Sequence, residues 1–266
     1  MTDNIFDISN QLITASKEGN IEQVKELLSN PQIDVNVQDE YGDTALMWTA
    51  RNGYKEIAEL LITHGADVNV QDKDGRSALM WTARNGYKEI AELLITHGAD
   101  VNVQNKYGRS ALMWTARNGY KEIAELLITH DADVNVQDEE GDSALMWTAC
   151  YGHKEIVEML ITHGADVNVQ NKYDWTALMW TVYCGHKEVV EMLITHGADV
   201  NMQEEDGWTA LILAACYGHK EVAEMLIQHG ANANLQDEEG DSALMWTARN
   251  GYKEIAELLI KNGAKN

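Results

Sequence analysis

The sequence predicts an all-α fold of stacked helix–turn–helix repeats, and three observations support this prediction. One segment recurs at a fixed spacing of 33 residues, each copy contains two amphipathic helical patterns, and nearly every pattern ends at a glycine. A fixed period of this size is typical of repeat proteins, in which each unit packs against its neighbours in sequence. One clear copy covers residues 72–104, and near-copies begin at Asp39, Asn105, Asp138, Asn171, Glu204 and Asp237.

Each repeat is expected to begin with a tight turn followed by a short helix. Residues 72–76 are polar and surround Gly75, which can adopt the positive φ that such a turn requires. Ser77 is a suitable N-cap, because its hydroxyl can accept a hydrogen bond from a backbone N–H of the next turn. We therefore predict a first helix over 78–85 that Gly86 stops.

The second half of the repeat predicts another helix and an extended arm. The apolar residues of 88–96 recur at helical spacing and form one stripe, which a single repeat cannot bury alone. Gly98 is expected to end this helix in the left-handed conformation. Residues 99–104 then form an extended arm, and the arm and the following turn should make a β-hairpin-like loop. Stacking of neighbouring helix pairs would bury the stripe.

This repeat resembles the ankyrin repeat, whose length and T-P-L-H-x-A signature it approaches. The resemblance implies an all-α ankyrin-repeat solenoid over residues 11–264, in which first-helix ends and turn tips line a concave groove that binds partners. Two departures are systematic: alanine replaces the family proline, as at Ala45, and methionine usually replaces the family histidine, as at Met47. We expect the flexible methionines to fill the space. In the first full repeat, the matching residues are Thr44–Ala50 (TALMWTA), Gly53, Lys55-Glu56-Ile57, Leu60-Leu61 and Gly65–Asn69 (GADVN).

The repeat pattern predicts one ankyrin-repeat domain over residues 1–266. Residues 1–38 form a degenerate N-terminal capping repeat, 39–236 form six full repeats, and 237–266 form a C-terminal capping repeat. The helices of the first cap are expected over 11–18 and 21–28. The copies are so alike that they indicate either recent duplication or an engineered array, and the sequence does not distinguish the two.

Two repeats carry aspartate where the others carry glycine. Asp131 follows a second helix, and Asp174 stands in a turn. Aspartate tolerates the left-handed conformation at a modest cost in free energy. We therefore expect slightly strained turns at these two positions and no break in the fold.

The charge and the termini limit the classes of partner. The formal net charge is −23, with 43 acidic and 20 basic residues. Such a surface disfavours nucleic acid and anionic membranes, so we expect no direct nucleic-acid partner and no membrane partner. A monomer is expected. An alternative is an acidic inhibitor or antitoxin-like protein that mimics nucleic acid and blocks a basic enzyme. The polar, acidic N-terminus has no signal-peptide pattern.

The chain has three cysteines and no C-x-x-C spacing. Cys150 and Cys216 hold the same repeat position two units apart, which places them about 20 Å from each other, too far for a disulfide. Reduced thiols are typical of an intracellular protein, and we expect a cytoplasmic location.

The sequence shows no pattern for catalysis or for a cofactor. Six of the nine histidines recur once per repeat at the end of the second helix. Their spacing of about 10 Å is too large for shared zinc ligation, so we expect them to stabilise helix C-termini. No phosphate-binding loop, nucleophile elbow or H-E-x-x-H motif is present. We therefore expect no enzyme, no catalytic residue, no cofactor and no metal site.

The candidate partner-binding residues lie at the turn tips and on one face of the first helices. Trp81 and Arg84, at i and i+3, illustrate the helical spacing that creates this face. Trp, Tyr and Arg dominate interface energetics, so we predict a scaffold that binds a protein or peptide with acidic and apolar segments. Two alternatives remain open. Each Trp could serve mainly as packing between adjacent first helices, and the variation at the turn tips could be sequence drift among surface positions. The basic half comprises Lys73, Arg76, Trp81, Arg84, Lys106, Tyr107, Arg109, Trp114 and Arg117, and the aromatic half comprises Tyr151, Tyr173, Trp175, Tyr183, Trp208 and Tyr217.

Overall fold

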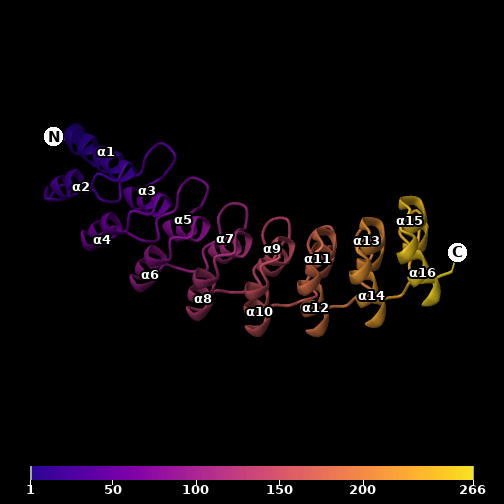
Figure 1. Ribbon diagram of the computed structural model, residues 1–266. Helices are drawn as coiled ribbons and strands as arrows, with labels where there is room; N and C mark the ends of the chain where they lie inside the picture. The colour runs from indigo at the N-terminus through magenta and orange to yellow at the C-terminus, as the bar shows by residue number, and fades with distance from the viewer. Residues whose placement is uncertain (1, 266) are drawn as a thin grey trace. The chain divides into compact units, whose positions relative to one another are not determined.

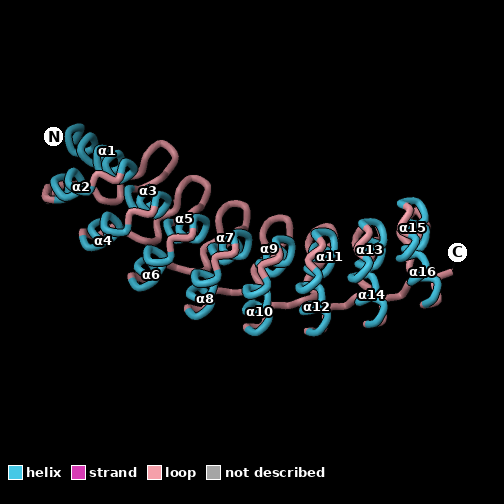
Figure 2. The backbone as a smooth tube through the Cα atoms, viewed as in Figure 1, coloured by secondary structure: helices cyan, strands magenta, loops and turns pink. Residues whose placement is uncertain are grey.

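The computed structural model describes the backbone of residues 2–265 and the side chains of residues 8–265. This part of the chain contains sixteen helices, arranged as pairs that repeat along the chain, and no named strand (Figures 1 and 2). The first helices of the pairs are α1 (Thr2–Glu18), α3 (Ala45–Asn52), α5 (Ala78–Asn85), α7 (Ala111–Asn118), α9 (Ala144–Tyr151), α11 (Ala177–Cys184), α13 (Ala210–Tyr217) and α15 (Ala243–Asn250). The second helices are α2 (Ile21–Leu28), α4 (Lys55–Thr63), α6 (Lys88–Thr96), α8 (Lys121–Thr129), α10 (Lys154–Thr162), α12 (Lys187–Thr195), α14 (Lys220–Gln228) and α16 (Lys253–Lys261).

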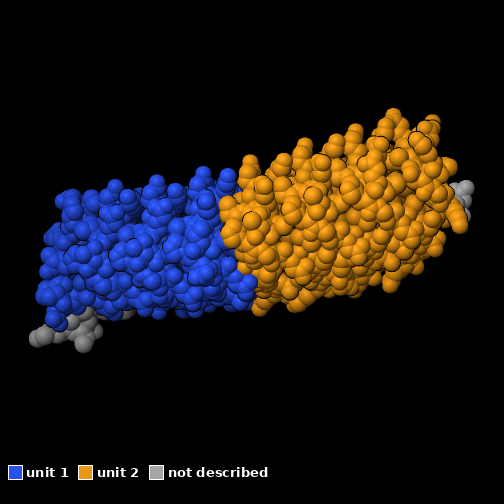
Figure 3. Space-filling model, turned by 90° about the horizontal axis from the view of Figure 1, so that it is seen from below, with its two compact units in different colours: residues 1–133 blue, residues 134–266 orange. Residues whose placement is uncertain are grey.

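The chain divides into two compact units, which Figure 3 colours separately. Unit 1 covers residues 1–133 and unit 2 covers residues 134–266. Within each unit, first helices pack against neighbouring first helices, and second helices pack against neighbouring second helices. The all-α stack of helix pairs that the sequence predicts is therefore confirmed. The prediction of a single domain over the whole chain stays a prediction.

The first helix of each repeat forms for the local reasons that its sequence indicates. The hydroxyl of Ser77 accepts a hydrogen bond from the backbone N–H of Met80, which satisfies one free donor at the start of α5. Gly86 ends the helix with a φ of 84°. A side chain there would also collide with the ring of Tyr120 in the next repeat, 2.7 Å from the added carbon. The predicted bounds of 78–85 are confirmed.

The second helix buries one stripe and exposes the opposite face. Ile90 and Leu94 of α6 are buried, while Glu89 and Glu92 are exposed. His97 follows the helix, and its Nδ1 lies 2.8 Å from the carbonyl oxygen of Leu93. A carbonyl oxygen can only accept, so Nδ1 carries the proton and satisfies one of the free carbonyls at the helix end. The other periodic histidines make the same contact, so all six lie against carbonyls at helix C-termini, and their stabilising role stays a prediction.

The extended arms join neighbouring repeats through asparagine. The Nδ2 of Asn69 donates to the carbonyl oxygen of Gly98, at 2.9 Å, and its Oδ1 accepts from the N–H of Asp100, at 2.8 Å. The predicted β-hairpin-like loops appear as isolated antiparallel bridges in three repeats, for example between Gln71 and Ser77. Each amide side chain therefore holds its arm against the following repeat.

The methionines that replace the family histidine belong to the core. Met47 and Met80 each keep only 1–2% of their surface exposed, so they fill the space as expected. One boundary was predicted wrongly, because α1 begins at Thr2, whereas the sequence-based helix began at Gln11. The prediction followed the repeat pattern, which residues 2–10 do not share.

Asp131 and Asp174 adopt the left-handed conformation, as expected. Their φ angles are 65° and 58°, and they are the only described residues other than glycine with positive φ. The repeat tolerates both substitutions, since the flanking helices α8 to α11 keep their usual bounds.

Candidate partner-binding face

In unit 1, arginines and indole rings alternate along the first helices. The guanidinium of Arg51 lies 5.0 Å from the ring centroid of Trp48 and 4.6 Å from that of Trp81. The guanidinium of Arg84 lies 5.5 Å from Trp81 and 5.0 Å from Trp114. Each arginine therefore contacts the ring of its own helix and the ring of the next helix. Such contacts are worth about 0.5–1 kcal/mol each at exposed sites.

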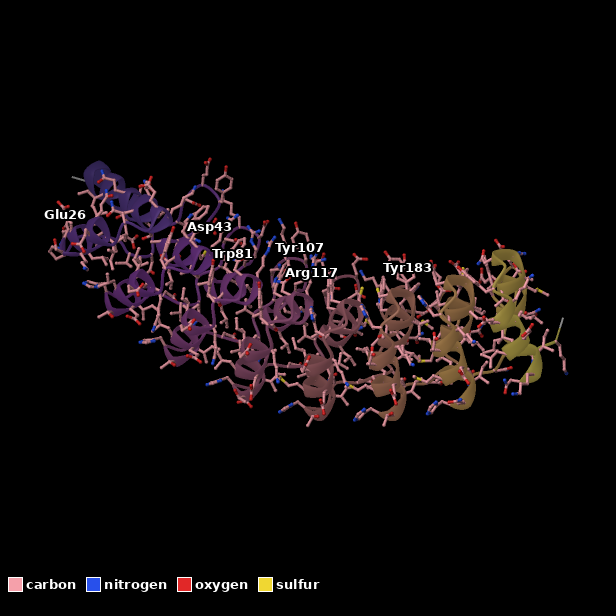
Figure 4. All side chains as sticks on the ribbon, in the orientation of Figure 1. Glu26, Asp43, Trp81, Tyr107, Arg117 and Tyr183 are labelled. Atoms are coloured by element: carbon pink, nitrogen blue, oxygen red, sulfur yellow. The ribbon has the colours of Figure 1, made fainter. Side chains whose placement is uncertain are left out.

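We call this row the Arg–Trp ladder. It continues at both ends, with Lys17 above Trp48 at 4.2 Å and Arg117 above Trp114 at 6.0 Å. Figure 4 labels Trp81 and Arg117 on this row of helices. The helical spacing of three residues between each Trp and its Arg makes the arrangement possible, since both then lie on one face. The ladder consists of Lys17, Trp48, Arg51, Trp81, Arg84, Trp114 and Arg117.

The indoles of the ladder are packing groups as well as surface groups. Trp81 is 4% exposed and belongs to the core, whereas Trp48 and Trp114 are half-buried. The Nε1 of Trp48 donates to the Oδ2 of Asp39 at 3.1 Å. In the next repeat, the equivalent carboxylate oxygen is Oδ2 of Asp72, and it accepts a hydrogen bond from the Nε of Arg76 at 2.6 Å. The Nε1 of Trp81 is then a buried donor without an acceptor among the described residues.

Two cations of the turn tips, Arg76 and Lys106, have carboxylate partners in the tips themselves. Arg76 pairs with Asp72 at 2.6 Å and with Asp74 at 3.1 Å. Lys106 pairs with the same Asp74 and also lies 5.2 Å from the ring of Tyr107. Arg109 lies 5.8 Å from Tyr107 and 6.0 Å from Trp114, while Lys73 is exposed. Arg76 and Lys106 are thus partly neutralised by carboxylates of the tips.

The ladder arginines repel one another. Desolvation lowers the pKa of Arg84, and the charges of Arg51, Arg76 and Arg117 lower it further. Arg84 remains charged at any physiological pH. The contributions of these three charges mean that Arg84 has cations around it, although the whole protein is strongly acidic. An anion bound at the ladder would therefore be stabilised by several cations at once.

The aromatic half, in unit 2, forms clusters of rings. The ring of Trp175 lies 4.5 Å from Trp180 and 5.8 Å from Tyr183, and Tyr183 lies 5.0 Å from Tyr217. Trp208 lies 4.8 Å from Trp246. Geometries that are tilted or edge-to-face, as here, are the favourable ones for aromatic pairs. The two tip indoles therefore pack on helix indoles of their own repeat or the next.

The tyrosines of the aromatic half keep much of their surface in solvent. Tyr151, Tyr183 and Tyr217 are 43–45% exposed, and Tyr183 is labelled in Figure 4. Tyr173, 51% exposed, donates its hydroxyl to the Oε2 of Glu140 at 3.1 Å. Exposed aromatic rings on one face are typical of interaction surfaces. The structure thus leaves these tyrosines accessible to a partner.

Unit 2 also contains a small pocket between α9 and α11 that sequence reasoning missed. Its volume is about 130 Å³. Its lining includes Cys150, and the Sγ of Cys150 lies 3.3 Å from the Sγ of Cys184. Only the pair Cys150–Cys216 was considered from the sequence, because those two hold equivalent positions. The pocket is lined by Asp142, Met146, Trp147, Cys150, Tyr151 and Trp180.

Among the side chains of residues 8–265, no group of three or more His, Cys, Asp or Glu is arranged to hold a metal ion. None of the sixteen described helices has both the length and the apolar composition needed to cross a membrane.

Stacked pairs of short helices, joined by asparagine-bonded arms and displaying a shared row of side chains, define a helical repeat protein. The chain belongs to the ankyrin repeat family. A family model of ankyrin repeats (3 copies) matches residues 12–105, 50–138, 112–204 and 178–266, which together cover most of the sequence. No curated protein matches the chain. The resemblance stated from the repeat sequence is thereby confirmed.

Proposed function

We propose that this protein is a non-catalytic interaction scaffold that binds a partner protein or peptide along its first helices and turn tips. The observation that carries the proposal is the Arg–Trp ladder, a row of cations and indoles repeated at one position of successive repeats. Ankyrin repeats generally mediate protein–protein interaction, which supports the same reading. We further propose that the protein acts as an intracellular monomer.

The chemistry of the two halves suggests what each would bind. The ladder offers several cations with apolar surface between them, so an acidic peptide with interspersed apolar residues would complement it. The aromatic half offers exposed tyrosine edges beside packed indoles, so it would take an apolar or aromatic segment. The predicted site residues of both halves remain proposals for a binding surface.

A labelled glutamate-rich peptide tests the basic half directly. The variant Arg51→Ala/Arg84→Ala/Arg117→Ala removes three ladder cations, and we expect its affinity for the peptide to fall at least about tenfold. A matched control is Lys55→Ala/Lys88→Ala/Lys121→Ala, which removes the same charge from exposed positions of the second helices. We expect the control to change affinity by less than about twofold. Equal losses in the two variants would reject the ladder as the site.

The aromatic half is tested by Trp175→Ala and Trp208→Ala in a pull-down with mass spectrometry. We expect recovery of at least one partner to fall in each variant, because tip indoles are typical hot-spot residues. Circular dichroism checks that helix content is unchanged. Unchanged recovery of every partner would reject the aromatic half.

A second candidate function rests on the acidic second helices. Their glutamates, such as Glu56, Glu89 and Glu122, are exposed at equivalent positions, and the net charge is −23. A regular row of carboxylates could mimic nucleic acid and block a basic enzyme. Inhibition of such an enzyme that weakens steeply with salt and survives the loss of the ladder arginines would favour this alternative.

A further inference from the structure

The strongest unassigned feature of the molecule is the pair of thiols formed by Cys150 and Cys184. Cys150 is near the end of α9, Cys184 is the last residue of α11, and these two helices pack side by side in unit 2. Their sulfur atoms are 3.3 Å apart, and both side chains are half-buried. A disulfide bond measures about 2.05 Å, so closure requires the sulfurs to approach by a little over 1 Å.

The repeats on either side show why these two positions meet. In unit 1, Asn85 holds the position of Cys184, and its Nδ2 donates to the carbonyl oxygen of Arg51, at 3.1 Å. Arg51 holds the position of Cys150 in the preceding repeat. Asn52, Asn118 and Asn250 make the same contact with the preceding first helix, or in the case of Asn52 with Lys17 of α1, so this position faces the end of the preceding helix. In unit 2 the same register places one thiol against another.

A second contact holds the helix end of Cys150 in place. The Nε2 of His186 lies 3.0 Å from the carbonyl oxygen of Cys150, and this carbonyl can only accept, so His186 donates. The His186 ring also packs against the backbone at Gly152, where an added side-chain carbon would lie 2.7 Å from it. His186 thus makes the hydrogen bond to the preceding helix end that asparagine makes in other repeats. The side chain of Cys184 contacts the thiol of Cys150 instead.

The third cysteine has a different environment. Cys216 is on α13, and Asn250 of the next repeat covers it. The Nδ2 of Asn250 lies 3.0 Å from the carbonyl oxygen of Cys216 and 3.7 Å from its sulfur. Cys216 is therefore a natural control within the same molecule, half-buried like the pair but placed against an amide.

We propose that Cys150 and Cys184 are a dithiol site that closes to an intrachain disulfide under a peroxide oxidant, joining two consecutive repeats. One thiol, as thiolate, attacks hydrogen peroxide, breaks its O–O bond and becomes a sulfenic acid, releasing one water. The other thiol then attacks this sulfur, the S–S bond forms, and a second water leaves. Two thiols lose two electrons and two protons in total, and the peroxide is reduced to two waters. The proposal is independent of the proposed function.

Access and reactivity set the conditions for this reaction. The pocket beside Cys150 has a volume of about 130 Å³, more than a peroxide molecule requires. Burial and the neighbouring thiol of Cys184 raise the pKa of Cys150 to about 12, so it is protonated at neutral pH. Closure should therefore be slow at pH 7 and faster at pH 9.

Trypsin separates the three cysteines and so makes the test specific. The cysteines fall on the peptides 122–154, 173–187 and 188–220. The full-length reduced protein is treated with hydrogen peroxide, its free thiols are counted, and its digest is analysed by mass spectrometry. We expect three thiols to fall to one, with a cross-link between 122–154 and 173–187. The thermal midpoint should rise by about 5–10 °C on oxidation.

Three variants provide the controls. Cys216→Ser should keep the cross-link and the rise in midpoint, whereas Cys150→Ser and Cys184→Ser should lose both. Circular dichroism of the reduced variants shows whether they are folded. Three unreacted thiols, a cross-link to 188–220, links between two molecules, or oxidation of single cysteines to sulfinic acid would each overturn the proposal.

Discussion

The two units of the molecule bury equivalent residues in their cores and differ on the face of their first helices. Leu94 in unit 1 and Leu193 in unit 2 hold equivalent positions, and both are fully buried. On the first helices, however, Arg84 and Asn85 of one repeat correspond to Tyr183 and Cys184 of another. The helix bounds are the same in both repeats. The fold therefore depends on the buried positions, while the ladder positions can take cations, phenols or thiols without changing it.

The largest expected effect tests whether the two cores are equivalent. Leu94→Ala and Leu193→Ala should each lower the free energy of unfolding by about 2–5 kcal/mol, because each leaves a cavity among fully buried side chains. Urea unfolding followed by circular dichroism measures both. A difference of more than about 2 kcal/mol between them would show that the cores are not equivalent, because the cost of such a change depends on how far the surrounding side chains can close the cavity.

The next comparison concerns two aspartates at one repeat position. Burial raises the pKa of Asp43 to about 6, and the charges of Asp72 and Asp39 contribute. The folded state therefore holds the Asp43 proton more tightly than the unfolded state. The contribution of Asp43 to the free energy of unfolding falls as the pH rises from about 4 to about 6. In unit 2, the equivalent Asp241 accepts a hydrogen bond from Arg249, at 2.9 Å.

Replacing these two aspartates by asparagine should have opposite effects. At pH 7, Asp43→Asn should stabilise the protein by about 1–2 kcal/mol, since it removes a buried, repelled charge. Asp241→Asn should destabilise it by about 0.5–1 kcal/mol, because Arg249 loses a charged partner. Urea midpoints at pH 7 and pH 4 are the measurement. The gain from Asp43→Asn should vanish at pH 4, and a gain that persists there would contradict the electrostatic explanation.

The links between neighbouring first helices give a smaller difference. His186→Ala removes a hydrogen bond to Cys150 and the packing of a ring, and should cost about 1–2 kcal/mol. Asn85→Ala removes only the hydrogen bond to Arg51 and should cost about 0.5–1 kcal/mol. Thermal unfolding of both variants at one pH measures the order. Equal losses would mean that the ring of His186 adds nothing by packing.

The smallest expected effects are gains at the two left-handed aspartates. At the glycine equivalent to Asp131, Gly98, a side-chain carbon would have no atom within 4 Å, so the cost there comes from the backbone alone. At the equivalent of Asp174, Gly141, the carbon would lie 2.9 Å from the backbone of the next repeat. Asp174→Gly should therefore stabilise the protein by about 1 kcal/mol and Asp131→Gly by at most about 0.5 kcal/mol. Urea unfolding at pH 7 tests the order, which a larger gain at Asp131 would contradict.

The sequence predicted the fold in more detail than it predicted the site. The bounds of α5 and α6 followed from Ser77, Gly86 and Gly98, because caps and left-handed glycines act locally. The pairing of Arg76 with Asp72 did not follow, and it changes the hydrogen bonding of Trp81. Such pairing depends on side-chain positions that repeat spacing does not specify.

The thiol pair was missed for a related reason. The period of 33 residues aligns equivalent positions, as for Cys150 and Cys216, whose separation is a multiple of it. Contacts between neighbouring first helices instead join residues 34 apart, as Asn85 and Arg51 do. This offset arises from packing between helices. A search of the sequence for pairs one residue beyond the period would have found Cys150 and Cys184.

The asparagine of each arm has a consequence for how such a chain can change in length. Asn69 makes two hydrogen bonds to the repeat that follows it, and Asn168 makes the same two bonds to the repeat that follows Asn168. A whole repeat removed or inserted between two arms would leave an identical junction behind. Unequal recombination within the gene would thus yield proteins that fold, and the number of repeats becomes a quantity that selection can adjust.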